Sequence, residues 1–424
     1  MKYLVLVGFL FSIGVGFAQH GLDKDIEKME SKVIEWRRDF HQHPELSNRE
    51  FKTAEKIAAH LRSLGMEVQT GIAHTGVVGL LKGNQPGKVL ALRADIDALP
   101  VPERADLPFK STATGTFRGE EVPVMHACGH DTHIAILMGV AEIMAKNKDK
   151  IKGTIKFIFQ PAEEGAPPGE KGGAKMMVEE GVLKNPDVDA IFGLHIGSAQ
   201  EVNTIAYKSG GIMAAVNSFE INVSGKQTHG SMPWGGVDPI MASVKIIDGL
   251  QTLVSREMPL TNEAVVLSIG KISSGVRSNI IPESAQIIGT LRTLDADMQA
   301  QIHKRMREMV PAIAKAYRAE ATIHIDEGYP ITYNDPELTS QMLPSLKAAA
   351  GENKVFEIKA ITGAEDFSFF QKEVPGLYFF LGGKAPDATE VFPHHTPDFY
   401  IDESGLLLGV KTFVQLSFDY LNKE

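Results

Sequence analysis

The chain has very little cysteine: Cys128 is the only one in 424 residues. A single thiol cannot form a disulfide within the chain, so disulfides cannot hold this fold together. Basic charge is also scarce, because 43 Lys and Arg residues stand against 53 Asp and Glu residues and leave a formal net charge of -10. No long block of Lys or Arg offsets this acidity. These absences argue against a nucleic acid or an anionic membrane as the main partner and favour a small molecule or a peptide.

Long uncharged apolar runs are missing after the N-terminus, so no membrane span is expected there. The one long apolar run, residues 3–17, follows Lys2 and ends near the small residues Gly16 and Ala18. This pattern is typical of a signal peptide, here residues 1–19, although a short membrane anchor is an alternative. We therefore expect an exported protein, periplasmic or secreted, without membrane contact after cleavage. Because a free thiol is a liability in an oxidising compartment, a metal is expected to hold Cys128.

The rest of the composition is that of a globular protein, with 43% hydrophobic and 23% charged residues, and the length suffices for two domains. Apolar runs of strand length alternate with amphipathic runs of helix length, which predicts an α/β fold. Helices are expected at residues 26–40, 53–64 and 131–146, and strands at residues 77–82, 88–93, 154–159 and 189–194. The Pro- and Gly-rich residues 165–173 indicate a loop.

A different element order follows. Strands are expected at residues 219–223, 264–272, 285–294 and 321–325, and helices at residues 238–257 and 297–317. This order of strand, helix, two strands, helix and strand is the ferredoxin-like arrangement. We therefore predict an inserted α+β domain at residues 212–327, between the two parts of a first domain, residues 20–211 and 328–424. In the second part, a helix is expected to open at residues 363–367, a strand at 376–381 and a helix at 404–421.

Polar side chains follow several of the predicted strands. Residues 93–97 (RADID) end one strand, Glu163 and Glu164 come just after another, and His195 follows a third. In open α/β sheets, ligands bind outside the carboxyl ends of the strands, so these clusters are expected to meet in one crevice.

The ligand types needed for a two-metal site are all present. Such a site takes about five to seven thiolate, imidazole and carboxylate groups. Cys128 and His130 lie two residues apart, and the pair His394 and His395 lies near the C-terminus. A lone histidine or a glutamate pair is more often structural or solvated, but together these groups predict a metal centre. The strongest single indication of this metal centre is Cys128, which lies between His126 and His130.

The two neighbouring glutamates are expected to take different roles. Side chains of adjacent residues on an extended backbone point to opposite sides, so Glu163 and Glu164 cannot both face the same metal. The one left free would lie over the water that the metals activate. Desolvation raises the pKa of such a carboxylate and nearby cations lower it, so it is a candidate general base.

Seven motifs in this order resemble a known family over nearly the whole mature chain. They are RADIDALP (93–100), MHACGHD (125–131), FQPAEEG (159–165), GLHIG (193–197), THGSMP (228–233), GAEDFS (363–368) and HHTPDF (394–399). They are similar to the dinuclear metallopeptidases that include aminoacylases and glutamate carboxypeptidase. The most similar subgroup contains bacterial N-acyl-amino-acid amidohydrolases, hippurate hydrolases and plant auxin-conjugate hydrolases.

The resemblance implies a zinc-peptidase-like catalytic domain with a central mixed sheet flanked by helices. It also implies two divalent metal ions per subunit, zinc or manganese, with cobalt or nickel as alternatives. The implied metal ligands are Cys128 as the bridge, His130, Glu164, His195 and His395. Glu163 is implied as the base and Asp97 as a residue that orients a ligand or the base. Asp95 supports the ligands, His394 is the weaker candidate of its pair, and His126 has no assigned role.

The resemblance also gives the inserted domain a role as lid and dimerisation domain, so a homodimer is expected. His229 is implied to reach the partner's active site and polarise the scissile carbonyl. Asn279 and Arg292 match positions that contact the substrate's carboxylate or the oxyanion. Two positions depart from the family's pattern: Thr132 after the GHD motif, and residues 166–171 after AEEG. Both lie next to the site, so the resemblance does not define the shape of the acyl pocket.

These observations predict a metal-dependent amidohydrolase that cleaves an N-acyl amino acid, or a short peptide with a free carboxylate, with Glu163 as general base. An exported carboxypeptidase or dipeptidase of the same fold is an alternative. A metal- or ligand-binding protein without turnover is a third reading. Glu163 argues against it, because a binding protein has no need of an unligated carboxylate over the water.

Overall fold

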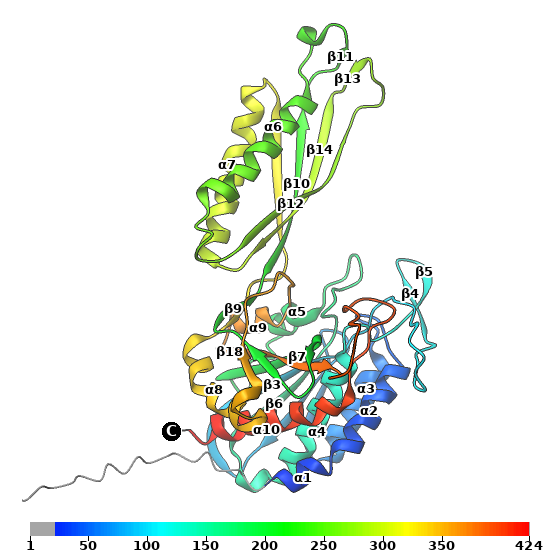
Figure 1. Cartoon of the computed structure of the whole chain (residues 1–424), viewed down its shortest axis with the longest axis vertical. Coiled ribbons are helices and arrows are strands. Elements are labelled where there is room, and N and C mark those ends of the chain that lie inside the picture. The colour runs from blue at the N-terminus through cyan, green and yellow to red at the C-terminus, as the bar shows by residue number, and fades with distance from the viewer. Residues whose placement is uncertain (1–21, 424) are drawn as a thin grey trace, which may run out of the picture.

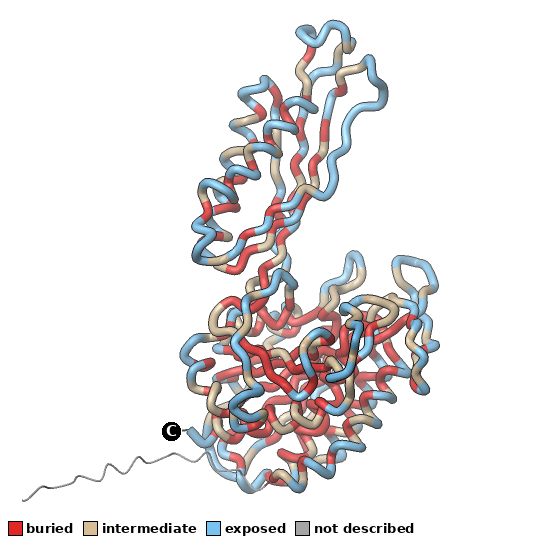
Figure 2. Tube along the Cα trace, in the orientation of Figure 1, coloured by how far each residue is buried: buried red, intermediate tan, exposed pale blue. Residues whose placement is uncertain are grey.

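The structure, a computed structural model, describes residues 22–423, so the predicted signal peptide lies outside the described residues. Residues 215–327 form an insert with its own hydrophobic core, and the other described residues form the body (Figure 1). Figure 2 shows buried positions concentrated in the centre of the body. Among residues 22–423, no helix combines the length and the apolar character that crossing a membrane would require.

A mixed sheet forms the centre of the body, as predicted, and it has eight strands. Its strand order is β1-β2-β6-β3-β7-β18-β8-β17. The strands are β1 (Glu67–Ile72), β2 (Gly76–Lys82), β3 (Gln85–Asp95), β6 (Lys152–Gln160), β7 (Ala190–Glu201), β8 (Ile205–Tyr207), β17 (Val355–Glu357) and β18 (Gly376–Lys384). The four central strands β6, β3, β7 and β18 run parallel, so their carboxyl ends meet at one edge.

Helices cover both faces of this sheet, which explains why the central strands are apolar almost throughout. One face packs on α1 (Asp23–Glu27), α2 (Glu30–Gln42), α3 (Phe51–Ser63), α4 (His130–Lys146), α8 (Pro336–Ala350) and α10 (Leu406–Leu421). The short helices α5 (Gly173–Glu179) and α9 (Ser368–Gln371) lie on the other face (Figure 1). A hairpin of β4 (Thr114–Phe117) and β5 (Glu120–Pro123) projects from the body.

The insert has the element order that the sequence predicts. Its elements are β10 (Ala215–Ser224), α6 (Pro239–Thr252), β12 (Val265–Ser274), β14 (Ser284–Thr293), α7 (Ala296–Ala316) and β15 (Glu320–Glu327). The antiparallel sheet has the order β12-β14-β10-β15, which is ferredoxin-like. A small pair, β11 (Thr228–His229) and β13 (Ile280–Ile281), lies at the far tip (Figure 1).

Two chain segments form a narrow neck between body and insert. On the body side, β9 (Gly210–Met213) pairs with β16 (Thr332–Asn334). Next to them, the Val216 amide donates to the Tyr329 carbonyl at 2.9 Å. Figure 1 shows the insert standing away from the body on this neck. The helices and strands of the insert pack mainly on one another.

Several elements differ from the sequence expectations. The predicted helix at 26–40 is divided between α1 and α2. Helix α8 was not predicted, because Pro344 interrupts the helical pattern of its buried residues Leu338, Met342 and Leu346. The predicted helix at 238–257 is α6 followed by a π-helical turn, Leu253–Glu257. Residues 363–367 precede α9 rather than open it.

Candidate metal centre and active site

The loop before α4 brings a thiol and an imidazole together at the edge of the sheet. Gly129 lies between Cys128 and His130 with φ 90°, a conformation that favours glycine. A Cβ at Gly129 would also lie 2.3 Å from Cγ2 of Ile196, so this position has no room for a side chain. The loop can therefore pass close to β7 only with glycine here.

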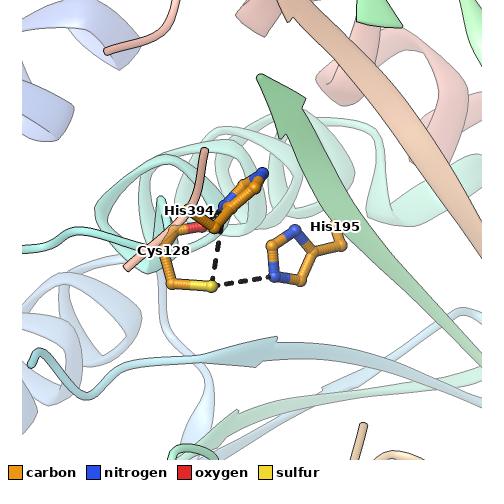
Figure 3. A group of neighbouring side chains, drawn as sticks. All are labelled: Cys128, His195 and His394. Carbon is orange, nitrogen blue, oxygen red and sulfur yellow. Dashed lines mark hydrogen bonds between the residues drawn. The ribbon is translucent and has the colours of Figure 1, made fainter. Parts of the chain in front are cut away.

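The Cys128 sulfur is the centre of the predicted ligand group. Its Sγ lies 3.3 Å from Nε2 of His195 and 3.3 Å from Nε2 of His395. Figure 3 shows Cys128 and His195 pointing toward each other, with His394 beside them. The expected strand ending before His195 continues to Glu201, because β7 pairs with β18 over this length. His195 therefore lies within the strand rather than after it.

Two of the histidines have Nδ1 bonded to a backbone carbonyl and Nε2 directed into the site. Nδ1 of His130 donates to the Asp97 carbonyl at 2.9 Å, and Nδ1 of His195 donates to the Ile196 carbonyl at 2.7 Å. A carbonyl only accepts, so these partners assign the proton to Nδ1 in each ring. Nε2 of buried His130 has no hydrogen-bond partner. Both rings therefore direct a lone pair into the site, as metal-ligating histidines do.

The neighbours His394 and His395 differ in this respect. Nδ1 of His394 lies 3.7 Å from the Cys128 sulfur, but it also lies 3.2 Å from the Cys128 carbonyl. Its Nε2 accepts from the Ser198 amide at 3.3 Å, so both ring nitrogens have partners. Nε2 of His395 faces the sulfur and lies 3.2 Å from Oε1 of Glu164. Although both are close enough for a metal, the hydrogen bonds favour His395.

Asp97 connects two of the predicted ligands. Its carbonyl and its Oδ1, at 3.2 Å, both face Nδ1 of His130. Its Oδ2 accepts from the Ser47 hydroxyl at 2.7 Å and from the Glu164 amide at 3.0 Å. Asp97 is thus held by Ser47 while it orients His130 and the backbone of Glu164, which is the supporting role that the resemblance implies.

The two glutamates belong to different candidate ligand groups, but an extended backbone is not the reason. The backbone is not extended there: Ala162 has φ 52° and its carbonyl accepts from the Gly165 amide at 3.3 Å, closing a turn. Glu164 lies in one candidate ligand group with Cys128 and His130. Glu163 lies in another candidate group, with Glu365 and Asp366, although Oε2 of Glu163 and Oε1 of Glu164 each lie 3.9 Å from Nε2 of His130.

Carboxylates surround Glu163. Burial, followed by the charges of Glu365, Glu164 and Asp366, raises the pKa of Glu163 well above its ordinary value. Burial and the charges of Glu164 and Glu163 likewise raise the pKa of the Cys128 thiol. A thiolate with this much negative charge around it requires a compensating cation.

The donor set fits two metal ions. One candidate group contains Cys128, His195 and His394, and a second contains Cys128, His130 and Glu164. His395 belongs to neither group, although its Nε2 is as close to the sulfur, at 3.3 Å, as that of His195. Because both groups share the sulfur, a bridging thiolate matches the geometry, and the unpartnered Nε2 of His130 supports ligation.

A buried cluster next to the site was missed by the sequence analysis. Nδ1 of His133 lies 2.5 Å from Asp95, and its Nε2 accepts from the Ile196 amide at 2.9 Å. Both nitrogens are therefore used, and His133 is not available to a metal. The spacing of three residues to His130, on one helix face, is the signal that could have revealed it.

Arg93 joins this cluster to the acids near Glu163. Its guanidinium contacts Asp95 at 2.7 Å, Glu365 at 2.9 Å and Asp366 at 3.0 Å. These contacts hold the three buried carboxylates together, which explains how so much negative charge is tolerated beside the site. Glu365 and Asp366 lie 272 and 273 positions after Arg93, so these pairs cannot be predicted by inspecting the sequence.

The predicted residues of the insert are not brought into this site. His229 is exposed at the far tip, where its Nδ1 accepts from the amide and hydroxyl of Ser231. Asn279 is exposed beside the same tip, and Arg292 is half-buried on β14. None of the three lines the cavity next to Cys128. Their roles in a partner's site stay predictions.

Comparisons with known proteins identify the family of the chain. The sequence model of Peptidase family M20/M25/M40 matches residues 91–419. Thermostable carboxypeptidase 2 of Saccharolobus solfataricus is 42% identical over 404 residues, 95% of this chain and 98% of that protein. N-acetylcysteine deacetylase of Bacillus subtilis is 38% identical over 388 residues, 91% of this chain and 96% of that protein.

A solved structure is similar over nearly the whole chain. The Bacillus subtilis YXEP protein, described as a dinuclear metal binding peptidase from the M20 family, superposes with a TM-score of 0.79 at 34% identity, covering 94% of this chain and 100% of that one. The chain therefore belongs to Peptidase family M20/M25/M40 and is a metal-dependent hydrolase.

Proposed function

We propose that the protein hydrolyses the amide bond of N-acyl amino acids, or of short peptides with a free carboxylate. One observation carries this proposal: of two adjacent glutamates, Glu164 shares a candidate ligand group with Cys128 and His130, whereas Glu163 lies outside that group, beside Glu365 and Asp366, and both line the same cavity. A carboxylate in this place can move a proton without leaving a metal short of a ligand.

The chain's own residues can perform each proton transfer. When bound, two divalent ions would supply Lewis-acid polarisation of the carbonyl and a lowered pKa for the attacking water. Glu163 takes the proton of that water and later delivers it to the leaving amine. Its raised pKa in the metal-free state would be lowered by the cations, which is the balance a base near neutral pH needs. Asp97 and the backbone carbonyl of Ile196 hold the ligating rings in place.

We propose further that the protein is a homodimer in which the insert acts as a lid. His229 would then polarise the carbonyl in the partner's site, with Asn279 and Arg292 on the carboxylate or the oxyanion. The distance of the insert's tip from the site within one chain supports a role across two chains (Figure 1). Zinc or manganese would be the metal, and residues 1–19 would direct export.

Removal of a C-terminal residue from peptides is the second candidate reaction. It is favoured by the carboxypeptidase relative, which is 42% identical to this chain. The two reactions differ only in whether the group before the amide is an acyl group or an aminoacyl group. A dipeptide with a free amino group therefore separates them from an N-acyl amino acid.

The test is an assay of the metal-loaded protein against N-acetyl-amino acids, hippurate, auxin conjugates and dipeptides. Glu163→Gln should lower kcat by about 100-fold or more on every cleaved substrate, because general base catalysis contributes about 100- to 10,000-fold. The variant should still bind two metals per chain by elemental analysis. If the wild type and Glu163→Gln are equally inert on all amides while binding metal normally, the hydrolysis proposal is wrong.

A further inference from the structure

The turn that carries the two adjacent glutamates has an unfavourable backbone conformation. Ala162 is buried with φ 52°, in the left-handed region. A residue other than glycine persists in this region only when its surroundings hold it there. The turn's own hydrogen bond, from the Gly165 amide to the Ala162 carbonyl, is long at 3.3 Å. Contacts from outside the turn therefore determine where the side chains of Glu163 and Glu164 point.

A buried carboxylate holds the start of the turn. Oε1 of Glu50 accepts from the Ala162 amide at 3.0 Å, and Oε2 of Glu50 accepts from the Thr75 hydroxyl at 2.5 Å. Glu50 is fully buried, so both of its oxygens need the donors that they have here. This contact fixes the backbone just before the glutamates, but it does not fix the glutamates themselves.

The peptide group between Glu163 and Glu164 is held at both ends. Its carbonyl, on Glu163, accepts from the Tyr329 hydroxyl at 2.7 Å. Its N–H, on Glu164, donates to Oδ2 of Asp97 at 3.0 Å. Because a trans peptide group is planar and its carbonyl and N–H point in opposite directions, these two contacts fix its orientation. This peptide group joins the proposed base to a predicted metal ligand, so its orientation sets one side chain relative to the other.

The hydroxyl that holds the Glu163 carbonyl comes from the neck of the insert. The Gly328 amide donates to the Val216 carbonyl at 3.0 Å, and the Val216 amide donates to the Tyr329 carbonyl at 2.9 Å. These bonds join the two chain segments of the neck at Tyr329. The Tyr329 ring packs edge-on against Phe369, with ring centroids 6.1 Å apart. The neck thus fixes the backbone of Tyr329 and Phe369 orients its ring, while its hydroxyl contacts the turn.

We propose that Tyr329 is a positioning residue for the general base, which it holds from the neck of the insert through the Glu163 carbonyl. This assignment rests on the proposed role of Glu163 in hydrolysis. The hydroxyl transfers no proton itself; it keeps the Glu163 carboxylate within reach of the water. A misplacement of about 1 Å can cost about 100-fold in rate, so a contact to the backbone of the base is enough to matter.

Tyr329→Phe removes the hydroxyl and keeps the ring. In the metal-loaded protein, kcat should fall at least about fivefold on each amide that the wild type cleaves, while KM changes less than about twofold, because only the placement of the base is altered. Tyr333→Phe is the matched control, the same exchange on β16 of the neck at a side chain that is 49% exposed. It should leave kcat and KM unchanged. Both variants should bind two metals per chain by elemental analysis.

Ala162→Gly tests whether the hydroxyl acts through the turn. Glycine adopts a positive φ without the steric cost that alanine has, so the turn should depend less on its outside contacts. In the Ala162→Gly background, Tyr329→Phe should lower kcat no more than about twofold, against at least about fivefold in the wild-type background. A hydroxyl that acted on the substrate directly would be equally important in both backgrounds.

Amide hydrogen exchange reports on the turn without turnover. In metal-loaded Tyr329→Phe, the amides of residues 162–165 should exchange at least about fivefold faster than in the wild type, because local opening of the turn becomes easier. Tyr333→Phe should exchange there at the wild-type rate. An inert wild type whose Tyr329→Phe variant still shows faster exchange would refute the hydrolysis but support the positioning of Glu163.

Four results would overturn the proposal. The first is a Tyr329→Phe variant with the kcat of the wild type, and the second is a loss of kcat that is equal in both Ala162 backgrounds. The third is a rise in KM with kcat unchanged, which would make the hydroxyl a substrate contact. The fourth is an exchange rate at residues 162–165 that Tyr329→Phe leaves unchanged.

Discussion

At the scale of single residues, the ligand geometry depends on Gly129. Gly129→Ala should destabilise the protein by about 2 to 5 kcal/mol, because it combines a strained positive φ with an overlap against Ile196. Gly119, with φ 85° and nothing within 4 Å of a Cβ, is the matched control. Gly119→Ala should cost about 1 to 2 kcal/mol, from backbone strain alone. Urea unfolding measures both, and equal losses would show that the overlap with Ile196 is unimportant.

Substitution of Cys128 and of His126, two residues apart, should affect metal content and activity differently. Cys128→Ala removes the atom shared by both candidate ligand groups, so metal content and activity should fall together, activity by more than about 100-fold. His126 is buried with neither ring nitrogen hydrogen-bonded, and burial lowers its pKa to about 3. His126→Ala should therefore keep two metals and lose much less activity. Elemental analysis decides, and equal metal loss in both variants would contradict the proposed bridge.

The residue scale also shows where sequence reasoning reached its limit. Cys128, His130, Glu164, His195 and His395 were identified by residue type and by motif, and the structure brings all five together. The buried ion pairs next to these ligands could not be predicted. Charged residues such as Arg93 read as surface in a sequence, because burial of a charge depends on partners hundreds of positions away.

At the scale of elements, a buried ionic bridge joins α2 to α4. Burial would raise the pKa of Asp131, but Arg37, whose Nε lies 2.9 Å away, and His41, at 2.8 Å, lower it. Burial would likewise lower the pKa of His41, but hydrogen bonds with Asp131 and Glu103 raise it. The two helices are thus held together by a carboxylate whose pKa is lowered and an imidazole whose pKa is raised.

The bridge gives stability a defined pH dependence. For His41, whose folded pKa is raised, the contribution is complete below about 6.5 and declines as pH rises through the folded pKa. For Asp131, whose folded pKa is lowered, the contribution is complete above about 3.9 and declines as pH falls toward the folded pKa. His41→Asn should therefore lower Tm most between about pH 4 and 6.5 and less at pH 9. A Tm difference that stays constant from pH 5 to pH 9 would contradict this.

Elements were predicted well where burial and periodicity agree. The central strands and α4 are apolar nearly throughout, so their residues define them. Helix α8 was missed because Pro344 obscures an otherwise regular pattern, and the turn at Ala162 was missed because a positive φ at alanine has no sequence signal. The strand end at His195 was placed too early, since the pairing of β7 with β18 decides its length.

At the scale of the whole molecule, the proposed dimer can be tested by mixing two inactive variants. His229→Ala and Glu163→Gln should each be nearly inactive alone. If His229 serves the partner's site, a hybrid dimer contains one site with both Glu163 and a wild-type His229, so an equal mixture should recover about one quarter of wild-type activity. Reassembly from dilute denaturant followed by an assay measures this. No recovery, with hybrid dimers present by native mass spectrometry, would show that both residues act within one chain.

The place of β18 in the sheet has a consequence for how the chain is made. This strand lies between β7 and β8 in the centre of the sheet, yet it is among the last elements to be synthesised. A growing chain that has only reached the insert leaves β7 with an open, apolar edge, which is a template for unwanted pairing. The body can therefore close only after residue 384 has emerged, whereas residues 215–327 contain all the strands of their own sheet and can fold earlier. The order of synthesis thus favours a finished insert attached to an unfinished body.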